Sequence, residues 1–229
     1  MASPSDASRR RQATVKAKVV LLGEGAVGKT SLVLRYSENK FNDKHEQTLQ
    51  ASFVEKRLNI GGKRIQLAIW DTAGQERYHA LGPIYYRDSQ GAIIVYDITD
   101  EDSFHKARNW IKELKRMLGD KVTLCIVGNK IDLDRQRTVS EKDALEYAES
   151  VGAKHYYTSA KQSKGVAELF LDLAKRILEA NPPSSSTPPE SQRGAPSSHP
   201  PSQPRQRSTL IVTDDSEQPS PKQGGGCCS

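Results

Sequence analysis

A short glycine-rich segment near the start of the chain constrains its fold more than any other. The segment Gly23-Glu24-Gly25-Ala26-Val27-Gly28-Lys29-Thr30 follows the apolar run Lys18–Leu22 and opens a stretch that is typical of a helix. It matches the pattern G-x-x-x-x-G-K-[ST], in which glycines let a tight loop join a strand to a helix. A buried strand that leads directly into a helix is the first unit of an α/β sheet.

Further apolar runs repeat this arrangement between residues 15 and 180. They predict buried strands at Lys18–Leu22, Ile65–Trp70, Ala92–Tyr96, Leu124–Val127 and His155–Thr158. Amphipathic stretches separate most of these runs, so the strands are expected to lie parallel, with helices on both faces of the sheet. In the last helix the apolar positions recur at steps of three and four residues, at Val166, Leu169, Phe170, Leu173 and Ile177.

One pair of runs reads instead as a hairpin. Ala51–Leu58 and the residues from Arg64 onward are separated by Asn59-Ile60-Gly61-Gly62-Lys63, which has the glycines of a tight turn. The hairpin adds one antiparallel strand at the edge of the sheet. The sequence therefore predicts an α/β, three-layer fold of the phosphate-loop NTPase kind, with six mostly parallel strands.

Composition divides the chain into one domain and two tails. Ten of the twelve prolines fall between Pro182 and Pro221, in a stretch with few aliphatic residues to compensate the entropy of ordering. We expect a globular domain at residues 16–180, a disordered arm at 1–15 and a disordered, variable tail at 181–229. No apolar run approaches the roughly 20 residues that cross a bilayer, and none suits a signal peptide.

The distribution of charge and cysteine excludes several classes of function. The formal net charge is +6, but the tail is balanced and only the arm, with Arg9, Arg10 and Arg11, is clearly basic. We therefore expect no nucleic-acid partner. We also expect the chain to be a monomer. The three cysteines have neither metal nor disulfide spacing, which fits a reducing compartment.

The glycine-rich segment predicts a polyphosphate site. Its glycines let backbone N–H groups point inward, and the N-terminus of the following helix adds positive potential. Lys29 would bring a full charge near the β and γ phosphates, and Thr30 would bind Mg²⁺. The residues assigned to this end of a nucleotide are Gly25, Ala26, Val27, Gly28, Lys29, Thr30 and Ser31.

A second motif, Trp70-Asp71-Thr72-Ala73-Gly74-Gln75-Glu76, lies at the end of another strand. The carboxyl edge of an open α/β sheet is where such folds present ligand groups. Asp71 would hold the metal through water, and Gly74 would offer its N–H to the γ-phosphate. Gln75 would orient the attacking water, as the catalytic residue.

Two tetrapeptides at strand ends predict which base is bound. In Asn129-Lys130-Ile131-Asp132, the Asp132 carboxylate can accept from the ring N–H and the exocyclic amine of guanine, which adenine does not offer in that arrangement. In Thr158-Ser159-Ala160-Lys161, the N–H of Ala160 would contact the guanine carbonyl. Lys130 would cover one face of the base, and Asn129 would tie this loop to the phosphate loop. Asn129, Lys130, Asp132, Ser159, Ala160 and Lys161 are therefore assigned to the base end, and the nucleotide is GTP or GDP.

Together these motifs resemble the Ras-like small GTPases, from Lys16 to Ala180. The resemblance implies that Thr48 is the threonine of the first switch, which binds Mg²⁺ and γ-phosphate in the GTP state. It implies that Phe41 packs against guanine. It also implies a slow hydrolysis that an activating protein accelerates with its own arginine. Such activators often bring a glutamine too, so the resemblance leaves the role of Gln75 in assisted turnover open.

Within these GTPases the chain is similar to the Rabs. The similarity rests on Arg77-Tyr78-His79-Ala80-Leu81, on Tyr85-Tyr86-Arg87 and on Tyr96-Asp97-Ile98-Thr99. It implies that Phe53, Trp70 and Tyr85 form an aromatic triad that effectors read. The segment Leu49-Gln50-Ala51-Ser52-Phe53 departs from many Rabs and resembles the early-endosomal subgroup, so the cytoplasmic face of early endosomes is the implied location, and vesicle trafficking the implied process.

The same resemblance gives meaning to the end of the tail. Cys227 and Cys228 are adjacent and do not match the C-a-a-X pattern, because the fourth residue from the end is Gly226. A double cysteine in a Rab implies two geranylgeranyl groups, which would anchor the chain to a membrane. It further implies a guanine-nucleotide exchange factor, a Rab escort protein and a GDP-dissociation inhibitor as partners, with the inhibitor-bound form in the cytosol. Leu210-Ile211-Val212 resembles the apolar element that escort proteins grip.

Two other functions stay open on the sequence. One is a nucleotide-bound scaffold that scarcely turns over, which the presence of Gly25, Thr48 and Gln75 disfavours. The other is a phosphate-loop kinase or ATPase, which Asp132 disfavours. A metal hydrolase or thiol enzyme is not indicated, because the histidines are scattered and Cys125 lies in an apolar run.

Overall fold

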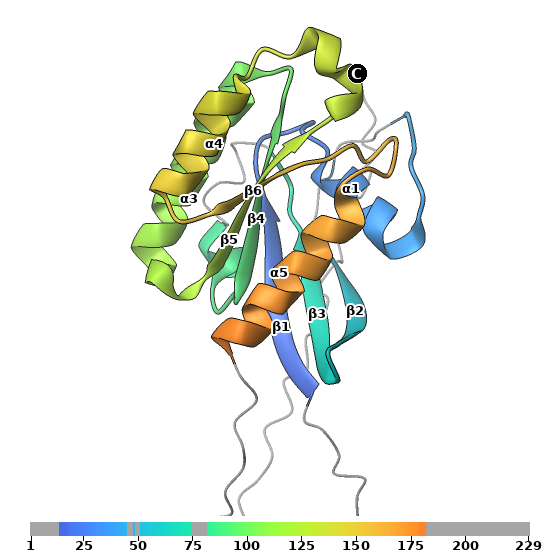
Figure 1. Ribbon diagram of the computed structural model, residues 1–229, viewed down its shortest axis with the longest axis vertical. Coiled ribbons are helices and arrows are strands. Elements are labelled where there is room, and N and C mark those ends of the chain that lie inside the picture. The colour runs from blue at the N-terminus through green and yellow to red at the C-terminus, as the bar shows by residue number, and fades with distance from the viewer. Residues whose placement is uncertain (1–13, 45–47, 49–50, 75–81, 182–229) are drawn as a thin grey trace, which may run out of the picture. The chain divides into compact units, whose positions relative to one another are not determined.

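The fold is a layered α/β domain, seen in a computed structural model that describes residues 14–44, 48, 51–74 and 82–181 (Figure 1). Its strands are β1 (Thr14–Leu22), β2 (Ser52–Ile60), β3 (Lys63–Asp71), β4 (Gly91–Asp97), β5 (Thr123–Asn129) and β6 (Lys154–Tyr157). They form one six-stranded sheet in the order β2-β3-β1-β4-β5-β6. Only β2 and β3 pair in antiparallel fashion, so the predicted sheet with one antiparallel edge strand is confirmed.

Strand β1 begins earlier than the sequence predicts. Thr14 and Val15 pair with Arg64 and Ile65 of β3, so the last two residues of the predicted arm belong to the sheet. The apolar run alone marked Lys18 as the start, because Thr14 and Lys16 are polar. Hydrogen-bond pairing with a long neighbour extends the strand beyond its apolar part.

The β2–β3 turn is shorter than predicted. The two strands end and begin at Ile60 and Lys63, so Gly61 and Gly62 alone make the connection, with φ of 56° and 80°. Positive φ at both central residues is the requirement of a type I′ turn, which matches the twist of a hairpin. The predicted five-residue loop is therefore wrong, because two glycines suffice.

The helices are α1 (Lys29–Glu38), α2 (Gly82–Tyr86), α3 (Glu101–Leu118), α4 (Glu141–Ser150) and α5 (Val166–Ala180). The described residues also form two 3₁₀ segments, η2 (Gly119–Lys121) and η3 (Ile131–Gln136). Helices α3 and α4 begin at side-chain caps, since Asp100 and Ser140 accept from the backbone N–H groups of Ser103 and Asp143. Of the helices that the structure describes, none combines the length and the apolar character needed to cross a membrane.

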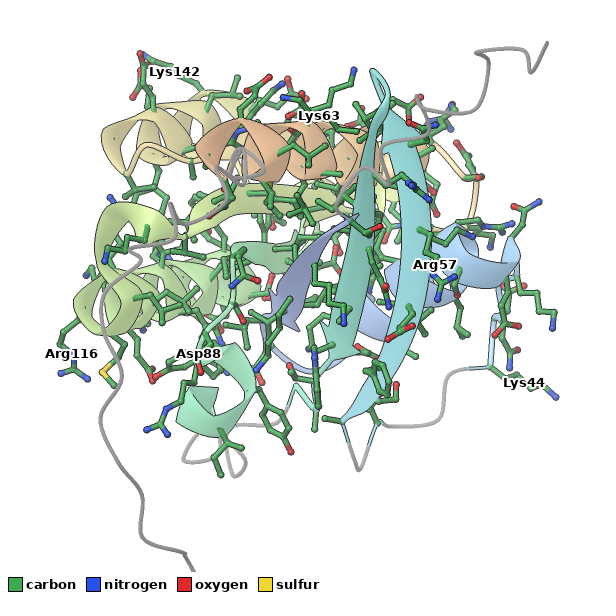
Figure 2. The ribbon with its side chains drawn as sticks, turned by 90° about the horizontal axis from the view of Figure 1, so that it is seen from below. Lys44, Arg57, Lys63, Asp88, Arg116 and Lys142 are labelled. Atoms are coloured by element: carbon green, nitrogen blue, oxygen red, sulfur yellow. The ribbon has the colours of Figure 1, made fainter. Side chains whose placement is uncertain are left out.

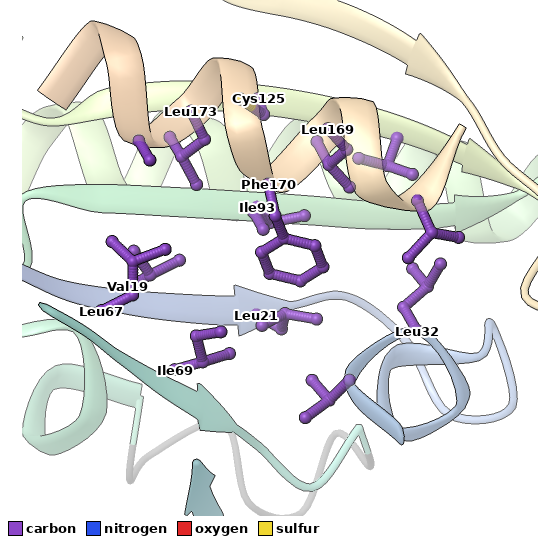
Figure 3. Packing of buried hydrophobic residues seen from close by; sticks show 14 of the residues in the cluster. Val19, Leu21, Leu32, Leu67, Ile69, Ile93, Cys125, Leu169, Phe170 and Leu173 are labelled. Carbon is purple, nitrogen blue, oxygen red and sulfur yellow. The ribbon is translucent and has the colours of Figure 1, made fainter. Parts of the chain in front are cut away.

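Two apolar cores lie on opposite faces of the sheet. Helices α1 and α5 cover one face, where Phe170 of α5 lies near Leu21 of β1 and Ile93 of β4 (Figure 3). Helices α3 and α4 cover the other face, where Tyr96, Phe104 and neighbouring aliphatic residues pack. Charged side chains such as Lys44, Arg116 and Lys142 lie on the outside (Figure 2). This layering leaves the carboxyl ends of the central strands free to form a site.

Candidate functional site

A cavity of about 460 Å³ lies where strands β1, β3 and β5 give way to loops. This volume is within the range typical of small-molecule sites. Its walls come from the loops after β1, β3, β5 and β6 and from the segment after α1. The lining residues are Gly25, Ala26, Gly28, Lys29, Thr30, Ser31, Phe41, Asp43, Thr48, Thr72, Gly74, Asn129, Lys130, Asp132, Leu133, Ala160 and Lys161.

The glycine-rich loop has the backbone shape that the sequence predicts. Gly28 ends the loop as the N-cap of α1, with φ of 98°. A side chain at this position would collide with the amide of Asn129. Because Gly28 has no side chain to cap the helix, the first N–H groups of α1 are left to face the cavity, where an anion is favoured.

Lys29 is the buried cation of the cavity. Its Nζ donates to the carbonyl oxygens of Gly23 and Glu24, each at 2.8 Å, and only 5% of the residue is exposed. Burial lowers the pKa of Lys29 to about 8, against the opposing charges of Asp71 and Glu24. A phosphate in the cavity would raise this pKa again, because an opposite charge favours the protonated form.

Three oxygen-bearing side chains meet beside Lys29. The hydroxyls of Thr30 and Thr48 lie 2.8 Å apart, although they come from α1 and from the segment before β2. Asp71 is 2% exposed, and its Oδ1 atom has no hydrogen-bond partner among the described residues. Burial raises the pKa of Asp71, and a hydrogen bond from Thr30 together with the charge of Lys29 partly offsets this.

This corner fits Mg²⁺. A buried carboxylate oxygen without a partner and two hydroxyls are hard oxygen ligands, and Mg²⁺ takes few protein ligands while keeping waters and phosphate oxygens. Among the residues that the structure describes, no cluster of three or more His, Cys, Asp or Glu side chains suits a metal. A site for a fully protein-bound transition metal is therefore not seen in this part of the chain.

The opposite end of the cavity is held by Asn129. Its Nδ2 donates to the carbonyl of Val27 at 2.9 Å, which is the link between the two loops that the sequence leads us to expect. Its Oδ1 accepts from the Thr158 hydroxyl at 3.1 Å and from the Ala160 N–H at 3.4 Å. One buried amide thus joins the loops after β1, β5 and β6.

Asp132 and Lys130 are also held in place. The Ser159 hydroxyl donates to Oδ1 of Asp132 at 2.5 Å, which leaves the rest of the carboxylate for a ligand. Lys130 adopts a left-handed backbone, with φ of 70°, and its Nζ pairs with Oδ2 of Asp97 at 2.7 Å. The charged end of this lysine is therefore anchored while its residue lines the cavity.

The structure brings together all residues assigned to nucleotide binding except Val27 and Ser159. The Val27 side chain is buried in the core and only its carbonyl serves the site, through Asn129. Ser159 stands behind Asp132. Gln75 lies outside the described residues, as do Cys227 and Cys228.

Sequence reasoning missed three residues of the cavity wall, Asp43, Thr72 and Leu133. Thr72 lies inside a recognised motif, and its hydroxyl donates to the carbonyl of Leu21 at 2.7 Å, which ties β3 to β1. Asp43 and Leu133 follow the predicted residues Phe41 and Asp132 closely in sequence. No pattern marks them, because only the path of each loop decides which side chain faces inward.

The predicted aromatic triad lies outside the cavity, with Phe53 on β2, Trp70 on β3 and Tyr85 on α2. The rings of Phe53 and Trp70 stack with centroids 5.6 Å apart, and those of Trp70 and Tyr85 are 6.4 Å apart. Phe53 is 54% exposed, which is high for a large apolar side chain. The three rings thus form one partly exposed apolar surface.

Comparison with known proteins identifies the family. The Ras family matches residues 18–179 of the chain. Ras-related protein Rab-21 of Bos taurus is 75% identical over 166 residues, which are 72% of this chain and 75% of the relative. Rab-21 of Dictyostelium discoideum is 68% identical over 161 residues, 70% of this chain and 76% of the relative. Ras-related protein Rab-5A of the same organism is 48% identical over 160 residues, 70% and 80% of the two chains.

The chain belongs to the Ras family of small GTPases, as a Rab. The resemblance read from the motifs is thereby confirmed. A Rab binds GTP, GDP and Mg²⁺ and hydrolyses GTP to GDP and phosphate, so the chain is a GTPase that serves as a switch in membrane trafficking. Exchange factors, activating proteins, dissociation inhibitors and effectors are the general partners of such a Rab.

Proposed function

We propose that this Rab is a membrane-anchored GTP/GDP switch that hydrolyses GTP slowly and acts in endosomal transport. One observation supports the nucleotide part most strongly. A single cavity has a buried lysine and an oxygen-rich corner at one end and the fixed carboxylate of Asp132 at the other. A triphosphate with Mg²⁺ suits the first end, and guanine suits the second.

At the phosphate end, Lys29 and the N–H groups of the first turn of α1 bind the phosphates. Thr30 and Thr48 would hold Mg²⁺ directly, and Asp71 would hold it through water. The bound Mg²⁺ supplies positive charge that neutralises the phosphate oxygens as the bond to the γ-phosphate breaks. A Cβ at position 74 would lie 2.5 Å from the carbonyl oxygen of Glu24, so this position requires glycine.

At the base end, Asp132 accepts from the ring N–H and the exocyclic amine of guanine. The N–H of Ala160 lies beside Asn129 at the same end and donates to the guanine carbonyl. Phe41 and the stem of Lys130 both line the cavity and pack against the base. Ser159 and Lys161 complete this end, the first by orienting Asp132 and the second by bordering the base.

Hydrolysis depends on Gln75, which orients the attacking water. Among the described residues, a Cβ placed at Gly25 would meet only the carbonyl oxygen of Gly74 within 4 Å, at 3.8 Å. We assign the space beside Gly25 to the water, to Gln75 and to an incoming arginine. An activating protein supplies that arginine. Without it the reaction is slow, because the resemblance to Ras-like GTPases assigns none of this chain's own arginines to the γ-phosphate.

State-dependent binding uses a separate surface. Phe53, Trp70 and Tyr85 form the partly exposed aromatic cluster between β2, β3 and α2, and we assign it to effectors. The γ-phosphate, through Thr48 and Gly74, orders the segments that flank this cluster. Hydrolysis releases those segments and the effector.

Membrane attachment uses the adjacent cysteines. We assign Cys227 and Cys228 to geranylgeranylation, with delivery by a Rab escort protein and extraction into the cytosol by a dissociation inhibitor. Two lipids give stable anchoring where one gives only marginal binding. The similarity to Rab-21 and Rab-5A supports the early endosome as the compartment.

Calorimetry on the full chain, freed of nucleotide, tests the nucleotide assignment. We expect binding of GDP and GTP and none of ADP or ATP in the same concentration range. Asp132→Asn should weaken GDP binding at least tenfold, because a charge-assisted hydrogen bond is lost. Asp134→Asn, in the same loop but exposed and paired with Arg137, is the matched control and should bind as the wild type does. Equal affinity for guanosine and adenosine nucleotides would refute the proposal.

A further inference from the structure

Arg35 connects three segments around the base end of the cavity, although no motif includes it. It lies in the last turn of α1 and is half-buried. The next segment of the chain carries Asn39, which caps α1, and then Phe41 and Asp43, which line the cavity. On the other side of Arg35 stands the loop between β6 and α5, which Figure 1 shows beside α1.

The guanidinium of Arg35 makes four hydrogen bonds across these segments. Its Nε donates to the carbonyl of Ala160 at 2.8 Å, and Nη2 donates to the carbonyl of Lys161 at 3.2 Å. Its Nη1 donates to the backbone carbonyl and to Oδ1 of Asn39, at 2.9 and 3.0 Å. Such a set needs the flat, forked donor array of arginine, since an ammonium cannot reach all these acceptors at once.

Two further contacts join the same segments. The guanidinium carbon of Arg35 lies 6.0 Å from the ring centroid of Phe41. Lys161 pairs with Asp43 at 3.2 Å, but these side chains are 57% and 76% exposed, so solvent screens that pair. Among the hydrogen bonds of the described residues, those of Arg35 therefore join the segment that carries Phe41 to the loop that carries Ala160.

We propose that Arg35 is a positioning residue that closes the base end of the cavity and thereby slows the departure of the nucleotide. The inference rests on the proposed function, because Phe41 and Ala160 are the groups assigned to guanine. A base held between two loops can leave only when the loops separate. Separation breaks the bonds from Arg35 to Ala160 and Lys161, which are more than 120 residues away in sequence.

The test measures how fast the full chain releases a fluorescent GDP when it is chased with excess GDP in the presence of Mg²⁺. Arg35→Ala should speed release about tenfold, which corresponds to about 1.4 kcal/mol. Arg35→Lys should fall between Arg35→Ala and the wild type, because it keeps the charge without the fork. The association rate should change less than the release rate, because the contacts form after the base has entered. If Arg35→Ala does not fold, Arg35→Lys and Arg35→Gln give the measurement.

Arg108→Ala is the matched control. Arg108 also lies on a helix and against a ring, with its guanidinium 4.5 Å from the centroid of Tyr147, but it is not part of the cavity. Release from this variant should stay within twofold of the wild type. A residue that only supported the fold would lower the melting temperature without changing the release rate.

Three results would overturn the inference. They are an acceleration below threefold in Arg35→Ala, an equal acceleration in Arg108→Ala, and an Arg35→Lys variant that releases GDP as slowly as the wild type. A wild-type chain that retains no fluorescent GDP at all would instead refute the proposed function. The two failures are therefore distinguishable in one experiment.

Discussion

At the scale of single residues, the site depends on polar groups that the protein buries but satisfies only in part. Within the described residues, Nζ of Lys29 donates only to backbone carbonyls, and Oδ1 of Asp71 has no hydrogen-bond partner. An unsatisfied buried polar atom destabilises the folded state by about 1–3 kcal/mol. A ligand that pairs with these atoms removes that penalty, which favours its binding. Nucleotide with Mg²⁺ is such a ligand, and its binding stabilises the folded state by mass action.

Burial makes the side chain of Cys125 unreactive, whereas it prepares Lys29 and Asp71 to bind a ligand. It is fully buried in β5, and burial raises the pKa of its thiol to about 12. The thiol therefore stays protonated and unreactive at neutral pH. The burial of Cys125 that its apolar run predicts is thereby confirmed.

Gln75→Leu gives a prediction at this scale. The variant should bind GTP normally but hydrolyse it at least tenfold more slowly in a single-turnover assay, because leucine cannot orient the attacking water. Gln136→Leu, an exposed glutamine at the end of η3, is the control and should hydrolyse at the wild-type rate. An unchanged rate in Gln75→Leu would remove the assignment of the catalytic residue.

At the scale of elements, apolar pattern predicts the existence of a strand better than its ends. Strand β4 is buried throughout, so the run Ala92–Tyr96 identifies it within one residue at either end. Strands β1 and β2 extend beyond their apolar parts because partners supply hydrogen bonds to polar residues. The site residues differ in the same way in how well sequence predicts them. Motifs identify Lys29 and Asp132, whereas Arg35 and Asp43 act through contacts that form only when the loops have folded.

Strand β6 gives a prediction about pH. Burial, with the nearby charge of Arg137, lowers the pKa of His155 to about 4. Its Nε2 lies 3.0 Å from the Tyr96 hydroxyl. The lowered pKa keeps the ring of the folded protein neutral at pH 7. In the unfolded chain His155 has its ordinary pKa of about 6.5. The contribution of the buried neutral ring to stability is therefore fully present above that pH. The contribution is lost as pH falls toward about 4.

Urea unfolding at pH 7 and pH 5, with saturating GDP and Mg²⁺, measures this contribution. The free energy of unfolding of the wild type should fall by about 2 kcal/mol more than that of His155→Gln. His105→Gln, which alters an exposed histidine of α3, should show the wild-type loss. Equal losses in the wild type and His155→Gln would show that the ring of His155 accepts a proton without cost in the folded state.

At the scale of the whole molecule, nucleotide state and membrane attachment are assigned to different parts of the chain. The cavity and the aromatic surface both belong to the domain between β1 and α5. The proposed lipid sites, Cys227 and Cys228, follow a tail rich in proline and serine. Because the nucleotide site and the proposed lipid sites share no residue, we expect the switch to work equally well with or without its anchor.

Replacing Cys227 and Cys228 together with serine tests this division. In cells the double variant should move from the membrane fraction to the soluble fraction, because the thiols that accept both lipids are gone. The purified variant should still bind GDP and hydrolyse GTP at wild-type rates, since the described residues that line the cavity already include every side chain assigned to direct contact with the phosphates and the base, apart from Gln75. Cys125→Ser is the control, because it removes a thiol that is buried in the domain and should leave the membrane fraction unchanged. Membrane association that survived the double substitution would mean that another part of the chain, or a partner, holds the protein at the bilayer.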